Sequence, residues 1–174
     1  MPQELKPASR PLYTPEERRR RDASRWTLVQ GILAPLQLLA FLVSVWLVLR
    51  YLNTGAGETA ATVSIVVKTM FLYAIMYTGA LWERDVFGVY LFAPSFYWED
   101  MVSMLVIALH TAYLVALATG ALTVREQMLL ALAAYLTYVL NALQFFLKLR
   151  AARRQGPADP AADLAASPSL AAGK

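Results

Sequence analysis

The sequence WERDVFGVYLFAPSFYWED, residues 82–100, interrupts the apolar part of the chain and divides it into separate runs. It contains four carboxylate residues, Glu83, Asp85, Glu99 and Asp100, together with seven aromatic residues. Carboxylates at the edge of a bilayer are costly to desolvate, so they tend to be kept there for a purpose. The segment is therefore both a connection between two apolar runs and the first place to look for chemistry.

The composition points to a membrane protein. Hydrophobic residues make up 58% of the chain and charged residues only 16%, whereas a soluble domain carries about a quarter charged residues. Four apolar runs cover about 26–52, 59–82, 99–120 and 124–149. Each reaches the roughly 20 residues that a helix needs to cross the hydrocarbon core. The pattern predicts an all-α integral membrane protein with four transmembrane helices in an up-down-up-down bundle.

The segments outside these runs predict two tails and a short extra helix. Residues 1–13 and the low-complexity residues 155–174 are expected to be disordered. Thr14-Pro15-Glu16-Glu17 is a capping box with proline at the first helical position, so a short basic interfacial helix is expected to start there. Residues 14–154, between the two tails, are therefore expected to form one domain.

The placement of basic residues predicts the orientation of the helices. Arginines precede the first apolar run and basic residues follow the last one, whereas the two loops at the opposite end carry only Arg125. The positive-inside rule places both termini and the 83–98 loop in the cytoplasm. Because the arginine run flanks an apolar span, it is interpreted as a topology signal and lipid headgroup anchor, and no nucleic-acid partner is expected.

Each predicted helix carries a polar residue near the middle of the bilayer. At about 1.5 Å per residue, Gln37, Tyr73, His110 and Asn141 lie roughly 13–16 Å deep. Such residues are expected to face the bundle interior, either as hydrogen bonds between helices or as the polar wall of a ligand cavity. Lys68 is expected to snorkel toward the outer surface, with pairing to a carboxylate as the alternative.

Helical phasing separates the two neighbouring acids of the third run. Glu99 shares a face with His110, because eleven residues at about 100° each return near the starting angle, while Asp100 lies about 100° away. Glu83 ends a comparable stripe on the second run that includes Lys68. Two alternatives stay open: Glu99 and Asp100 can simply favour a helix N-terminus, and Glu83 can pair with a nearby arginine.

His110 is the only histidine in the chain. It is read as a packing residue, a proton relay or a metal ligand. A bis-histidine haem site, a histidine-rich zinc site and a di-iron His/Glu cluster cannot be built within one chain that has a single histidine.

Several motifs together resemble the 3-vinyl bacteriochlorophyllide hydratases of bacteriochlorophyll synthesis. The resemblance covers about residues 12–154 and rests on WTLVQGILAPLQ (26–37), VKT (67–69), GALWE (79–83), YLFAP (90–94), FYWED (96–100), ALHTAY (108–113) and NALQFFLKLRAAR (141–153). It implies a carbon–oxygen lyase (hydro-lyase) that adds water across the C3 vinyl group of a chlorophyllide or bacteriochlorophyllide. It further implies a magnesium tetrapyrrole substrate, a bacterial inner (photosynthetic) membrane, neighbouring pathway enzymes as partners, and no cofactor beyond the substrate's magnesium.

Hydration of a vinyl group requires a proton donor, negative charge near the resulting cation, and a base that orients water. Glu83 and Glu99 are the preferred catalytic pair, with Asp85 and Asp100 as second choices. His110 is a candidate axial ligand of the substrate magnesium, with water or Asn141 as the alternative. The candidate substrate-binding residues are His110, Lys68, Tyr73, Trp82, Tyr97, Trp98, Asn141 and Gln37.

Two other functions fit part of this pattern. A non-enzymatic membrane protein that binds or assembles tetrapyrroles would share the pocket and the histidine, but it would not need four carboxylates in one segment. A proton-coupled transporter fits poorly, because every acid lies at or beyond the end of an apolar run.

Overall fold

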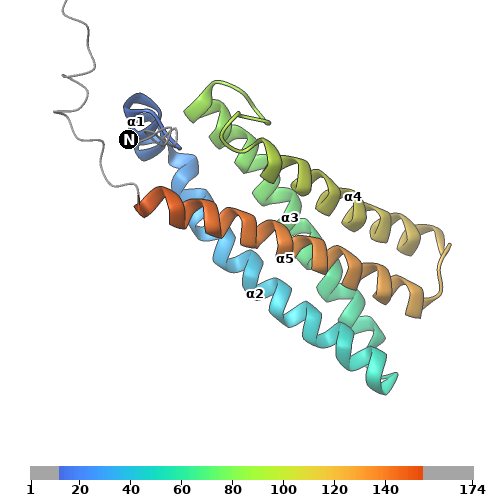
Figure 1. Ribbon diagram of the computed structural model, residues 1–174. Coiled ribbons are helices and arrows are strands. Elements are labelled where there is room, and N and C mark those ends of the chain that lie inside the picture. The colour runs from blue at the N-terminus through green and yellow to red at the C-terminus, as the bar shows by residue number, and fades with distance from the viewer. Residues whose placement is uncertain (1–11, 155–174) are drawn as a thin grey trace, which may run out of the picture.

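The computed structural model describes residues 12–154, and the regular structure in this range is entirely helical (Figure 1). The helices are α1 Pro15–Ala23, α2 Arg25–Thr54, α3 Glu58–Phe87, α4 Tyr97–Thr119 and α5 Val124–Arg154. Four of them, α2 to α5, are long and apolar enough to cross a membrane. The predicted four-helix membrane bundle is confirmed. The expectations for residues 1–11 and 155–174 lie outside the described residues.

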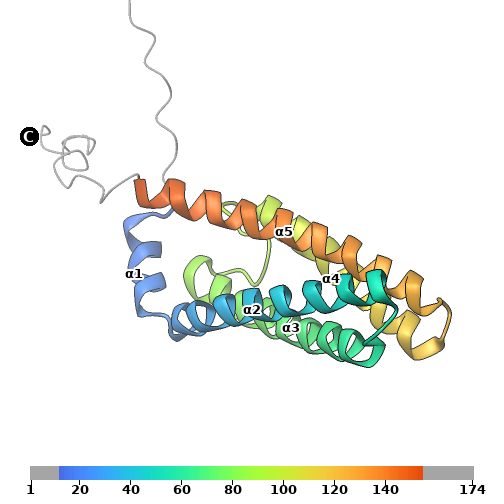
Figure 2. The ribbon, with the colours of Figure 1, turned by 90° about the horizontal axis from the view of Figure 1, so that it is seen from below.

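The four long helices form an elongated bundle of two hairpins. The α2 helix packs chiefly along α3, and α4 along α5, with smaller contacts joining α2 to α5 and α3 to α4. The short α1 crosses one end of the bundle and contacts α3 (Figure 2). We call this end, which also holds residues 88–96, the loop end. The other, where the turns after α2 and α4 lie, is the hairpin end.

The α3 and α4 helices extend further toward each other than the apolar runs indicate. The α3 helix continues to Phe87 and stops at Gly88, whose φ of 80° is a left-handed conformation that suits glycine. Its last turn buries Val86 completely, so the turn is held by packing. The connection shrinks from the expected 83–98 to residues 88–96, and Glu83 and Asp85 lie on a helix.

The expected start of α1 is confirmed. Thr14 accepts a hydrogen bond from the Glu17 backbone N–H at 3.2 Å, and the Glu17 side chain accepts one from the Thr14 N–H at 2.7 Å. Ser24 has an extended backbone that separates α1 from α2, and its side chain accepts a hydrogen bond from the Trp26 N–H. The chain therefore turns at Ser24 and enters the bundle as α2.

The bundle is apolar on its outside and rich in polar groups inside. Large apolar side chains lie on the outside: Trp46 is 60% exposed and Leu136 is 64% exposed. Charged residues such as Lys68 and Glu83 are buried. This distribution is the reverse of a soluble protein and suits a bundle whose outer surface contacts lipid.

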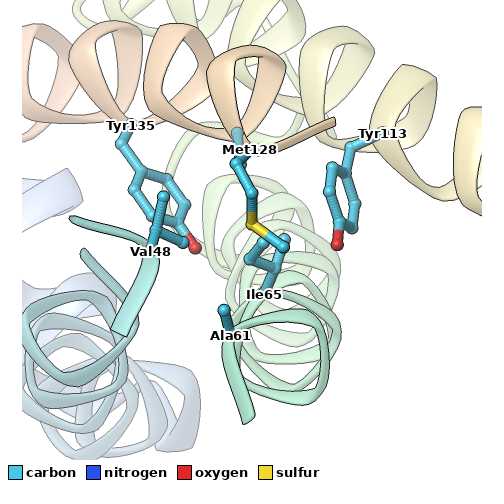
Figure 3. Packing of buried hydrophobic residues seen from close by; sticks show 7 residues of the cluster. Val48, Ala61, Ile65, Tyr113, Met128 and Tyr135 are labelled. Atoms are coloured by element: carbon cyan, nitrogen blue, oxygen red, sulfur yellow. The ribbon is translucent and has the colours of Figure 1, made fainter. Parts of the chain in front are cut away.

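An apolar cluster joins the four long helices toward the hairpin end (Figure 3). Val48 comes from α2, Ile65 from α3, Tyr113 from α4, and Met128 and Tyr135 from α5. All are at most 2% exposed. The two helical hairpins are therefore locked together here, which fixes the relative positions of the polar residues at the loop end.

Candidate functional site

Aromatic rings hold the 88–96 loop against the bundle. Phe96, at the end of this loop, is buried and stacks on Phe145 of α5 at a centroid distance of 5.9 Å. Trp82 meets Phe96 edge-on at 5.6 Å, and Tyr13 stacks on Phe87 at 5.9 Å. Such ring pairs stabilise a contact beyond the apolar area they bury. The loop is therefore anchored to α3, α5 and the segment before α1.

Leu12 and Tyr13 are part of this anchor, so the prediction of a disordered tail that includes them is wrong. Tyr13 is only 5% exposed. The Ser95 hydroxyl donates a hydrogen bond to the Leu12 carbonyl at 3.1 Å. Burial raises the pKa of Tyr13 to about 12, so its phenol is neutral at physiological pH.

Two carboxyl groups meet beneath the loop. Glu83 of α3 and Asp100 of α4 are 5% and 3% exposed, and their side chains are hydrogen-bonded to each other. The loop backbone closes over them: the Ala93 N–H donates to Glu83 Oε2 at 3.1 Å and the Phe92 N–H donates to Asp100 Oδ2 at 2.7 Å. Since ionised carboxylates only accept hydrogen bonds, the bond between the two requires one shared proton. The pair thus holds one acid and one base side by side.

The third acid at this end is ion-paired with α5. Lys148 Nζ lies 2.5 Å from Glu99 Oε2. Asn141 donates to the Glu99 carbonyl at 3.1 Å and to the Ser103 hydroxyl at 2.7 Å, and Ser103 itself donates to the Glu99 carbonyl. Glu99 therefore belongs to a network of an ion pair and hydrogen bonds that ties α4 to α5.

The expected partnership of Glu83 with Glu99 is replaced by one with Asp100. The phasing correctly separated Glu99 from Asp100, but it could not say which face of α4 meets α3 and which meets α5. The side of α4 that carries Glu99 packs toward α5 at this level, and Asp100 points to α3.

Asp85 and Trp82 contact the start of α2. The Ser24 hydroxyl donates to Asp85 Oδ2 at 2.8 Å, and the Trp82 indole N–H donates to the Thr27 hydroxyl at 3.0 Å. Asp85 is exposed, on the side of α3 away from the carboxyl pair. These contacts fix α3 to the α1–α2 junction.

A second polar site lies deeper in the bundle. Lys68 Nζ is 2.6 Å from His110 Nε2, and both side chains are buried. His110 Nδ1 lies 2.7 Å from the Val106 carbonyl, which can only accept, so Nδ1 carries the proton and Nε2 accepts from Lys68. The Lys68 ammonium also lies 4.2 Å from the Tyr138 ring centroid and 5.2 Å from that of Tyr135.

This geometry changes two expectations. Lys68 does not snorkel to the surface; it is 0% exposed, because aromatic faces and a histidine nitrogen satisfy it inside the bundle. It contacts no carboxylate among residues 12–154. The Nε2 lone pair of His110 is already engaged by Lys68, so a magnesium ligand role for this histidine would require that bond to break.

The remaining candidates lie in different environments. Tyr73 and Thr111 share a hydrogen bond of 2.7 Å between α3 and α4. Gln37 is buried, and neither atom of its amide has a hydrogen-bond partner within residues 12–154. Tyr97 and Trp98 are 45% and 72% exposed at the start of α4. The candidates therefore form no single pocket: some surround the carboxyl pair, some lie deep, and some face outward.

Sequence reasoning missed two groups of functional interest. The backbone amides of Phe92 and Ala93 carry no sequence signal, because any residue except proline supplies one. Tyr135 and Tyr138 did carry a signal, since they and Asn141 recur at three-residue steps on α5.

The fold and this site define a polytopic membrane protein with a buried, proton-sharing carboxyl pair. The model of the family "2-vinyl bacteriochlorophyllide hydratase (BCHF)" matches residues 13–151, and the chain belongs to that family. A 2-vinyl bacteriochlorophyllide hydratase of Rhodobacter capsulatus is 62% identical over 91% of this chain and 92% of its own length. One of Cereibacter sphaeroides is 66% identical over 83% of this chain and 89% of its own. No solved structure matches the chain. The family resemblance expected from the motifs is confirmed; "2-vinyl" and "3-vinyl" are two wordings for one family.

Proposed function

We propose that this chain is a hydro-lyase that adds water to the C3 vinyl group of chlorophyllide or bacteriochlorophyllide, giving a 1-hydroxyethyl group. The observation that carries the proposal is the Glu83–Asp100 pair, which supplies an acid and a base within one hydrogen bond. Membership of the hydratase family along 13–151 supports the same reaction.

The pair suits both halves of the reaction. Its protonated member gives the proton to the terminal vinyl carbon, and the electron pair of the double bond forms the new C–H bond. The cation left on the inner carbon is delocalised into the macrocycle, and the ionised member stabilises it. Water then bonds to the inner carbon and loses a proton to the ionised carboxylate. The pair ends with one proton, as it began, so no redox cofactor is needed.

Electrostatics favours the Glu83–Asp100 pair over the Lys68–His110 pair as the place where the vinyl group is protonated. A carbocation is stabilised by nearby negative charge and destabilised by a cation. The Lys68–His110 pair carries no negative charge and lies among aromatic rings. The vinyl group should therefore reach the loop end, where Glu83 and Asp100 lie.

The loop end also offers groups for the rest of the macrocycle. Tyr97 and Trp98 are exposed rings one turn or less from Asp100 and can cover a flat ring face. The anionic propionate can pair with Arg25 or Arg150, at the ends of α2 and α5. The charge pattern of the sequence supports a cytoplasmic orientation of this end and of both termini at the inner membrane. Water, an oxygen ligand that magnesium prefers, would complete the metal's coordination.

The proposal is tested by product mass. Purified protein in lipid nanodiscs is incubated with the vinyl chlorophyllide in H₂¹⁸O, and the pigment is analysed by mass spectrometry. We expect a gain of one H₂¹⁸O in the wild type and none in a Glu83→Gln/Asp100→Asn double variant. Pigment that binds the wild type but never gains mass would contradict a hydratase and favour the non-enzymatic binding protein.

A further inference from the structure

Gln37 is a buried amide that the carboxyl chemistry does not use. It lies on α2 and is only 2% exposed, and both Oε1 and Nε2 lack a hydrogen-bond partner among residues 12–154. A glutamine amide offers two donor hydrogens and an oxygen with two lone pairs. Leaving all of them unpaired inside a bundle is strongly unfavourable, and such groups in folded proteins are commonly satisfied by bound water.

Helix register places Gln37 beside the polar face of α5. Phe41, one turn further along α2, contacts Tyr138 and Tyr135 of α5 at 5.0 and 5.5 Å between ring centroids. The two helices run in opposite directions, so one turn toward the loop end from this contact brings Gln37 to the level of Asn141. Gln144 follows Asn141 on α5, and its Oε1 is also buried and unpartnered within the described range.

Polar groups continue from this level in both directions. Toward the hairpin end, Lys68 Nζ lies against Tyr138 and uses one of its three hydrogens on His110. At this level, Asn141 donates hydrogen bonds to the Ser103 hydroxyl and to the carbonyl of Glu99, and Glu99 lies toward the loop end. A buried water needs two to four polar partners, and the register set by the Phe41–Tyr138 contact brings Gln37 to the level of these groups.

We propose that Gln37 anchors a buried water site between the Lys68–His110 pair and the acids of the loop end. The site takes water itself as its ligand, held by the Gln37 amide with the Gln144 oxygen as a second contact. Its role rests on the proposed function: hydration consumes one water per turnover, lipid supplies none, and this site would deliver it toward Glu83 and Asp100.

The site is tested by infrared spectroscopy in H₂¹⁶O and H₂¹⁸O, with three variants on the same helix. Gln37→Met removes the amide at similar size, and Gln37→Asn keeps a shorter amide. The matched control is Gln30→Met, since Gln30 is an amide of α2 whose Nε2 already donates to the Ile75 carbonyl and the Thr78 hydroxyl. We expect ¹⁸O-sensitive O–H bands of internal water in the wild type, Gln37→Asn and Gln30→Met, and their loss in Gln37→Met.

Thermal unfolding and kinetics complete the test. A hydrated Gln37 predicts that Gln37→Met leaves Tm unchanged or lower, and lowers kcat about tenfold or more at constant KM, because water is no longer positioned. Unchanged bands with a raised Tm would overturn the site, since a dry, unpaired amide gains stability when replaced by methionine. If Gln37→Met loses the water bands but keeps its kcat, the Gln37 site does not deliver water to Glu83 and Asp100, and that role is overturned. A wild type that binds water but never hydrates pigment would instead reject the proposed function.

Discussion

Glu99 and Asp100 are consecutive residues on α4 whose side chains reach different helices. Asp100 is hydrogen-bonded to Glu83 of α3, and Glu99 is ion-paired with Lys148 of α5. A rotation of about 100° per residue separates them. Because Asp100 is hydrogen-bonded to another acid and Glu99 is paired with a lysine, the two neighbours meet different electrostatic environments, and only the first is equipped for proton transfer.

Removing either member of the carboxyl pair should abolish most hydration. Glu83→Gln or Asp100→Asn keeps the size and a hydrogen bond but removes the acid or the base, so turnover should fall by about 10²–10⁴-fold. The protein should remain folded and bind pigment, as measured by thermal unfolding and by the absorption of bound chlorophyllide. Turnover within threefold of wild type in both variants would discard the mechanism.

Breaking the Glu99–Lys148 ion pair should affect stability more than chemistry. Their side chains are 10% and 25% exposed, so Lys148→Met leaves a partly buried carboxylate without its cation and should destabilise the protein by about 2 kcal/mol. The double variant Glu99→Gln/Lys148→Met removes both charges and should recover most of this loss. Chemical denaturation of the wild type, the single variants Glu99→Gln and Lys148→Met, and the double variant measures the coupling between the two residues. Additive losses would show that the pair is not coupled.

The membrane helices could be predicted from the sequence because length and hydropathy decide them. The separation of Glu99 from Asp100 was also predictable, since it depends only on the helical repeat. The partner of Glu83 was not, because it depends on how α3, α4 and α5 are rotated about their axes. Those rotations are set by the packing of residues such as Phe96 and Tyr135, whose contacts are non-local.

The buried lysine shows the same limit. Snorkelling is a reasonable prediction for a lysine known only by its depth, because an isolated ammonium in lipid is unstable. Lys68 stays inside because Tyr138 and His110, distant in sequence, provide a ring face and a nitrogen acceptor. No periodicity within α3 contains that information.

The histidine geometry predicts the spectrum of bound pigment. Because His110 Nε2 accepts a hydrogen bond from Lys68, it should not ligate the chlorophyllide magnesium. His110→Ala should therefore leave the visible absorption of bound chlorophyllide unchanged while lowering Tm, since Lys68 loses its partner. Lys68→Met is the companion variant, because it removes the hydrogen bond from Lys68 and so frees the Nε2 lone pair of His110. A shifted absorption band of bound chlorophyllide in the single variant His110→Ala would establish that His110 ligates the magnesium and would refute this assignment.

The loop backbone at Phe92 should be strained. Its φ of 62° is a left-handed conformation that non-glycine residues adopt at a cost of about 1 kcal/mol or more. Its N–H nevertheless donates to Asp100, so the strain accompanies a contact to the carboxyl pair. Phe92→Gly should be more stable than Phe92→Ala by about 1 kcal/mol, as measured by chemical denaturation. The two variants lose the same ring, and equal stabilities would mean that the backbone is unstrained.

Alkaline pH should release the segment before α1 from the loop. Burial raises the pKa of Tyr13 to about 12, against about 10 in an unfolded chain. The neutral phenol is the form that packs on Phe87, so its contribution of about 2 kcal/mol is complete below pH about 10 and is lost as the pH rises toward about 12.

A variant in which Trp82 is the remaining tryptophan reports this release by fluorescence, since Trp82 packs against Phe87 and Phe96 at the same place. Tyr13→Phe is the matched control: it keeps the ring and cannot ionise, so the fluorescence change between pH about 10 and 12 should disappear. The same transition in both proteins would assign it to another group and leave Tyr13 without a role in the pH response. Its disappearance would show that a neutral ring at position 13 holds the segment before α1 against the loop that covers Glu83 and Asp100.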